Sequence, residues 1–135
     1  MSRPTAVTFG VAGHEITDQE RDLIKQIQPF GFILFRRNCG QPKQVRALIA
    51  DLKSCVEHDP PIMIDQEGGR VNRLPSPPWP PFPAPGALSI IEEAEIGTLD
   101  DAVYWHARLT GEVLRNINVS VNCAPMLDIP AEGSD

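Results

Sequence analysis

The chain has 135 residues, which is enough for one domain with a hydrophobic core. Its formal net charge of −6 at pH 7 and its lack of a basic cluster argue against nucleic acid or an anionic membrane as the main partner. No apolar run approaches the roughly 20 residues of a membrane-spanning helix. The first residues lack the apolar block of a secretory signal, so we expect a cytoplasmic protein.

The sequence gives no indication of a metal or disulfide framework. Its three cysteines are Cys39, Cys55 and Cys123, and no two have the C-x-x-C spacing of a zinc or redox site. We expect all three to be reduced. Aspartate, glutamate and histidine do not cluster at metal-ligand spacing. The three histidines are interpreted as ordinary surface or helix residues.

The first half of the chain alternates between short apolar runs and an amphipathic stretch. Residues 7–11 predict a first strand. Thr17 and Glu20 have the spacing of a capping box, so we expect a helix to begin there and to end at Pro29. The continuously apolar run 32–35 is typical of a strand buried on both faces.

The second half continues the alternation. Apolar residues recur at helical spacing over 45–56, and 61–64 predict a third strand. A second capping-box pattern opens a helix expected over 98–116, and 119–123 predict a fourth strand. The inward face of that helix should hold Ala102, Val103, Leu109, Val113 and Leu114. Strands that alternate with helices pair in parallel through right-handed crossovers, so the fold class is α/β.

Residues 74–87 interrupt this pattern with an irregular loop. Seven prolines lie between Pro75 and Pro85. One interpretation is a ligand for a proline-binding module. We favour the other, a stiff loop packed over the scaffold, because Trp79 and Phe82 can pin it to the body and prolines lower the entropy cost of ordering it.

The stretch 65–73 places two acids and two arginines directly after the expected third strand. Burying such charges unpaired is expensive, and sites in α/β proteins are built at the ends of strands. Asp128 adds another carboxylate just past the fourth strand. The glycines at 68 and 69 fit neither a dinucleotide loop nor a phosphate loop. We therefore expect a different kind of site at this edge of the sheet.

Blocks of sequence in a fixed order give the chain a family resemblance. They are Gly-Phe-Ile-Leu-Phe-Arg-Arg-Asn at 31–38, the stretch 64–74 with Asp-Gln-Glu-Gly-Gly-Arg at its centre, the end of the helix near Ile117, and Val-Asn-Cys-Ala-Pro-Met-Leu-Asp at 121–128. Together they resemble the N-terminal part of glycoside hydrolase family 3, and closely its bacterial β-N-acetylhexosaminidase branch, which serves cell-wall recycling.

The resemblance implies a (β/α)8 barrel that removes terminal non-reducing β-linked N-acetylglucosamine from muropeptides with retention of configuration. It implies no metal and no organic cofactor. Asp65 would bind hydroxyls of the sugar, Arg73 would help to hold it, and Asp128 would belong to the same substrate site by orienting a downstream arginine. Glu67 is interpreted as structural, paired with Arg70 or a backbone amide, rather than as a catalytic partner of Asp65.

The chain departs from the family in its length. A (β/α)8 barrel needs about 250 residues, so residues 1–135 are expected to be an incomplete domain of about four βα units. By the resemblance, the nucleophile and the general acid/base would both lie beyond Asp135, and we expect no catalytic residue here. The isolated chain should then be inactive. The alternative is a non-catalytic half-barrel that binds sugar weakly or self-associates, since exposed strand edges invite association.

Overall fold

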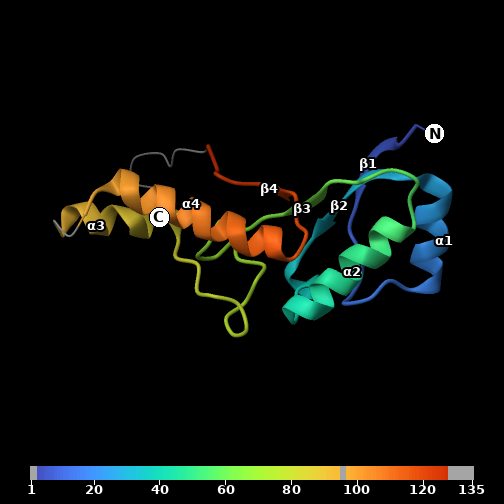
Figure 1. Ribbon diagram of the computed structural model, residues 1–135, viewed down its shortest axis with the longest axis horizontal. Coiled ribbons are helices and arrows are strands. Elements are labelled where there is room, and N and C mark those ends of the chain that lie inside the picture. The colour runs from blue at the N-terminus through green and yellow to red at the C-terminus, as the bar shows by residue number, and fades with distance from the viewer. Residues whose placement is uncertain (1–2, 95–96, 128–135) are drawn as a thin grey trace.

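The computed structural model describes residues 3–94 and 97–127 (Figure 1). Helices and strands alternate, as the sequence predicts, and two short 3₁₀ helices lie in the connections. In chain order the elements are β1 (Thr5–Phe9), α1 (Asp18–Ile27), β2 (Pro29–Leu34), η1 (Arg36–Asn38), α2 (Pro42–Ser54), β3 (Ile62–Ile64), η2 (Pro85–Leu88), α3 (Ser89–Glu93), α4 (Leu99–Asn116) and β4 (Val121–Asn122).

The strands form one parallel sheet in the order β1-β2-β3-β4. This confirms the predicted α/β class. β1 begins and ends two residues before the expected 7–11, because its pairing starts where the Thr5 amide donates to the Gln28 carbonyl oxygen at 2.8 Å. Val11 instead lies buried in the following loop, where the side chains of Arg37 and Asn38 donate to its carbonyl oxygen.

One face of the sheet is covered by helices and forms the core. The side chains of Phe32, Leu34, Ile62 and Ile64 on this face are all 1% exposed or less. The apolar stripe predicted for 45–56 packs against the same core, and its buried members include Val45, Leu48, Ile49, Leu52 and Cys55. α1 and α2 lie together at one end of the molecule, and α3 and α4 extend from the other end (Figure 1).

The other face of the sheet is open in the part of the chain that is described. Thr8 and Val121 are exposed on it, and Met63 is only half-buried. A parallel sheet is ordinarily covered on both faces. The described residues therefore build only one of the two layers that such a sheet requires.

Both helix N-termini predicted from capping patterns are confirmed. The Glu20 amide donates to Thr17 Oγ1 at 3.2 Å, and Glu20 Oε2 accepts from the Thr17 amide at 2.8 Å, which completes a capping box. At α4 the Asp101 amide donates to Thr98 Oγ1 at 3.2 Å. These bonds satisfy amide groups that the first helical turn leaves without partners.

The predicted inward face of α4 is partly wrong. Leu114 is buried, but Val103 is 48% exposed and Leu109 is 63% exposed. The carboxyl end of α4 packs on the core, and α4 also contacts α3 and η2. Helical periodicity predicted an apolar face, but only part of that face is buried.

The proline-rich loop is packed onto the body, as we favoured. Trp79 and Phe82 are 4% and 8% exposed. The Trp79 indole Nε1 donates to the Gly40 carbonyl oxygen at 2.8 Å, and the Phe82 carbonyl oxygen accepts from the Gly69 amide at 3.0 Å. The two aromatic residues therefore anchor the loop. None of the described helices is long and apolar enough to cross a membrane.

Candidate functional site

The predicted sugar ligands Asp65 and Arg73 meet at the carboxyl end of β3. Arg73 Nη2 donates to Asp65 Oδ2 at 2.9 Å. Their side chains are 24% and 27% exposed, so the ion pair is partly desolvated and still reachable from solvent. Asp65 follows Met63 at the strand period of two, which directs it toward the open face of the sheet rather than toward the helices. The structure thus brings together two of the three predicted site residues.

The third predicted ligand, Asp128, lies outside the described residues. Just after β4, the Cys123 amide donates to the Ile64 carbonyl oxygen at 2.8 Å. That bond places Cys123 beside Asp65. Burial, and then the Asp65 carboxylate, raise the pKa of the Cys123 thiol.

Two glycines form the turn that returns the chain from Asp65 to Arg73. Gly68 and Gly69 have φ angles of +95° and +59°, which residues with a Cβ rarely adopt. A Cβ on Gly68 would also collide with the Pro83 carbonyl oxygen, and one on Gly69 would lie 2.6 Å from the Ala84 Cβ. The turn thus needs glycine both for its backbone angles and for its contact with the proline-rich loop.

We expect Gly68→Ala to lower the free energy of unfolding by about 3 kcal/mol, because it combines a strained φ with a backbone collision. Urea denaturation followed by circular dichroism measures this. Gly86→Ala is the matched control, since nothing lies within 4 Å of a Cβ at that position. Equal stability of the two variants would contradict this account of the turn.

Gln66 and Asn122 contribute to the site, and the sequence reasoning missed both. Gln66 is 1% exposed, and its backbone amide donates to Asn122 Oδ1 at 2.9 Å. Asn122 Nδ2 donates back to the Gln66 carbonyl oxygen at 3.0 Å. The signal in the sequence was a pair of amide side chains at two predicted strand ends, but 56 residues separate them.

Glu67 does not make the contacts predicted for it. Neither an ion pair with Arg70 nor a bond from an amide to its carboxylate occurs within the described ranges 3–94 and 97–127. Glu67 instead lines a cavity of about 510 Å3 beneath α4, together with His106 and Thr110. Asp65 is not among the residues that line this cavity.

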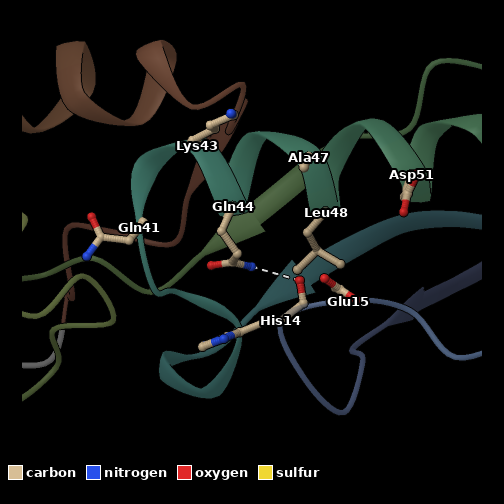
Figure 2. Close-up of a pocket in the computed structure, with 8 residues that line it drawn as sticks. All are labelled: His14, Glu15, Gln41, Lys43, Gln44, Ala47, Leu48 and Asp51. Atoms are coloured by element: carbon tan, nitrogen blue, oxygen red, sulfur yellow. Dashed lines mark hydrogen bonds between the residues drawn. The ribbon is translucent and has the colours of Figure 1, made fainter.

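A second cavity, of about 390 Å3, lies between α2 and the loop after β1 (Figure 2). Gln44 Nε2 donates to the His14 carbonyl oxygen at 2.8 Å across it. None of the predicted site residues lines this cavity. His14 is exposed, in keeping with its interpretation as a surface residue.

Asn38 is structural. It is fully buried, and its Nδ2 donates to the carbonyl oxygens of Val11 and Gly13 at 3.0 and 2.7 Å. Its Oδ1 accepts from the Phe35 amide at 2.9 Å. These bonds join the loops after β1 and β2. Within the described ranges, no group of three or more histidine, cysteine, aspartate or glutamate side chains could hold a metal ion.

The cysteines are all free thiols and differ in accessibility. Cys39 is buried, which raises its pKa to about 12, whereas Cys123 is exposed. We expect iodoacetamide to label Cys123 first in the native protein, measured by peptide mass spectrometry. Its raised pKa means less thiolate at a given pH, so labelling should be slower than for a free cysteine and should accelerate as pH rises. Denaturant should expose all three; native labelling of Cys39 as fast as Cys123 would contradict the assignment.

Comparison with known proteins shows where this site belongs. Residues 5–135 match the Glycosyl hydrolase family 3 N terminal domain. A beta-hexosaminidase from Stenotrophomonas maltophilia (strain K279a) is 34% identical over 123 residues, which are 90% of this chain and 36% of that protein. A beta-hexosaminidase from Xanthomonas oryzae pv. oryzae (strain KACC10331 / KXO85) has the same identity over 126 residues. The chain therefore spans about a third of the length of these relatives.

Solved structures agree. NagZ from Neisseria gonorrhoeae superposes with a TM-score of 0.84 at 26% identity, over 93% of this chain and 37% of that one. A glycoside hydrolase family 3 beta-N-acetylglucosaminidase from Paenibacillus sp. str. FPU-7 gives 0.76 at 36% identity, over 91% and 23%. The chain belongs to glycoside hydrolase family 3, and its four-stranded parallel sheet is part of the barrel of that family.

Proposed function

We propose that this chain supplies the sugar-binding part of a retaining β-N-acetylhexosaminidase. The observation that carries the proposal is the Asp65–Arg73 pair, which lies at the carboxyl end of β3 and remains reachable from solvent. A carboxylate accepts hydrogen bonds from neighbouring hydroxyls of a sugar, and charge-assisted bonds of this kind are the stronger ones. Asp128 is proposed to belong to the same substrate site.

The proposed substrate is a muropeptide with a terminal non-reducing β-linked N-acetylglucosamine. The names of the relatives support an N-acetylhexosamine: they include beta-hexosaminidases and a beta-N-acetylglucosaminidase. A further structure of Neisseria NagZ is in complex with N-trifluoroacetyl-D-glucosamine. Peptidoglycan recycling in the cytoplasm, without a cofactor, is the setting that we propose.

In the proposed mechanism this chain binds the sugar but does not cleave it. Retaining hydrolysis needs a nucleophile and an acid/base group, commonly carboxyl groups about 5–5.5 Å apart. Asp65 forms an ion pair with Arg73, and Glu67 lines the cavity beneath α4. We therefore assign neither of these roles to either residue. We propose that residues 1–135 form one incomplete domain, which is inactive by itself.

The direct test is a titration of the purified chain with N-acetylglucosamine, followed by NMR. We expect weak binding, with a Kd of about 1–10 mM, because only part of a sugar site is present. Shifts should centre on residues 65–73. An absence of binding at about 100 mM sugar would count against the proposal.

The second candidate is a non-catalytic half-barrel that self-associates. The observation in its favour is the exposure of large apolar side chains on α4, of which Trp105 is 56% and Leu109 is 63% exposed. The open sheet face ends in two edge strands, β1 and β4, that lack an outer neighbour among the described elements. Unpaired edges and apolar patches promote association.

Size-exclusion chromatography with light scattering tests this candidate. Self-association predicts a molar mass of at least two chains at about 100 μM. Leu109→Glu should lower this mass toward that of one chain, because the change places a charge in the apolar face. Glu112→Gln, which changes a charge on the same helix and leaves its apolar side chains intact, is the control. A monomer at all concentrations would remove the candidate without touching the sugar-binding proposal.

A further inference from the structure

We propose that Gln66 is the positioning residue of the sugar-binding pair: its buried carboxamide fixes the backbone of Arg73, so that the guanidinium reaches Asp65. The inference rests on the proposed function for its consequence, which is sugar affinity. Its structural basis is a set of hydrogen bonds within the turn that separates the two ligands.

The carboxamide of Gln66 closes this turn at its returning end. Gln66 Oε1 accepts from the Arg73 amide at 3.0 Å and from the Leu74 amide at 3.2 Å. Gln66 Nε2 donates to Asn72 Oδ1 at 2.9 Å, which orients the carboxamide. A single side chain therefore satisfies two consecutive backbone amides, one of them that of the ligand Arg73.

The backbone of Gln66 is itself fixed from the opposite side. Asn122 at the end of β4 bonds both its amide and its carbonyl oxygen. These bonds join the chain just after β3 to the end of β4. The sheet, rather than the turn, therefore fixes the backbone from which the Gln66 side chain extends. Gln66 therefore connects the backbone of Arg73 to the ends of β3 and β4.

Arg73 needs such a support because its guanidinium is weakly constrained. It has one ion pair, through Nη2, and its buried Nε has no hydrogen-bond partner within the described structure. Two parallel hydrogen bonds in a bidentate arginine–carboxylate pair would fix the orientation of the guanidinium. A single hydrogen bond constrains that orientation less. The direction in which Arg73 leaves the backbone therefore decides whether it reaches Asp65.

The test is Gln66→Met, which keeps the length of the side chain and removes all three of its hydrogen bonds. NMR of the Arg73 Nε–Hε group reports the position of the guanidinium, and titration reports the affinity for N-acetylglucosamine. We expect the Arg73 signal to move or broaden and the affinity to fall by about tenfold, because a displaced guanidinium loses a charge-assisted hydrogen bond to the sugar. An unchanged Arg73 signal would overturn the proposal.

Ser120→Ala is the matched control. Ser120 Oγ accepts from the Ile62 amide at 2.9 Å, so this change also removes a bond to β3, but at the other end of the strand. It should lower stability and leave both the Arg73 signal and the affinity within about twofold of the wild type. If both variants weakened binding equally, Gln66 would be merely structural and the proposal would fail.

If Gln66→Met does not fold, Asn72→Ala decides the question, because it removes the bond that orients the carboxamide, together with the bond that Asn72 Oδ1 accepts from the Leu74 amide at 3.0 Å, and leaves Gln66 itself in place. The same displacement of the Arg73 signal is expected, with a smaller loss of affinity, and no displacement would overturn the proposal. If the wild type binds no sugar, the proposed function fails, but the Arg73 signal still shows whether Gln66 positions that residue.

Discussion

The 135-residue chain is expected to release no measurable p-nitrophenol from p-nitrophenyl N-acetyl-β-D-glucosaminide. The physical reason is that glycoside hydrolysis needs both a nucleophile and an acid/base, and our proposal assigns neither role to Asp65, which pairs with Arg73, or to Glu67. Loss of such groups lowers turnover by on the order of 10⁴-fold or more. The rate should therefore lie at least that far below the rate of a whole family member.

The measurement compares the short chain with the same chain extended through any downstream reading frame. The whole beta-hexosaminidase from Stenotrophomonas maltophilia is the positive control, since this chain matches only 36% of it. Activity in the extended protein alone would support a division between sugar binding here and chemistry elsewhere. Turnover by the short chain that Asp65→Ala abolishes, with host enzyme excluded, would mean that the catalytic groups are assigned wrongly.

The second large effect is expected from Asp65→Ala, which should weaken N-acetylglucosamine binding by at least about tenfold. The variant removes a charge-assisted acceptor and leaves the guanidinium of Arg73 without its ion-pair partner, and bonds to charged groups are worth about 1.5–3 kcal/mol each. NMR titration measures the affinity. Asp65→Asn should lose less, because an amide oxygen can still accept from Arg73.

Asp59→Ala is the control for this substitution. Asp59 is also a carboxylate in an ion pair, at 2.6 Å from Lys53 Nζ, but it is exposed and lies before β3 rather than after it. Its loss should leave sugar affinity within about twofold, because an exposed pair contributes little to the rest of the molecule. Equal effects of the two alanine variants would show that Asp65 is not a ligand.

The pairing of Asp65 with Arg73 illustrates how far the sequence predicts the site. The stretch 65–73 was identified from its place after an apolar strand, because strand ends in α/β proteins carry functional groups, and the family resemblance then assigned Asp65 and Arg73 within it. Their ion pair was found only in the structure, since a separation of eight residues does not fix how a turn brings two side chains together. The role of Gln66 could not be predicted either, because a carboxamide at this position gives no sign of which backbone amides it will meet.

What the sequence determined by itself was local. The capping residues Thr17 and Thr98, the helical stripe of α2 and the alternation of strands with helices all depend on neighbours a few positions apart, so they could be predicted with their places in the chain. Gly68 and Gly69 indicated a turn for the same reason.

The tertiary structure alone decided which of these surfaces are covered. The register of β1 depends on pairing with β2, and the contact between Gln66 and Asn122 joins residues 56 positions apart. Leu109 belongs to an apolar face by periodicity, yet its side chain is mostly exposed in the folded chain. Periodicity fixes which side of an element is apolar, whereas burial depends on partners that only the folded chain brings into contact.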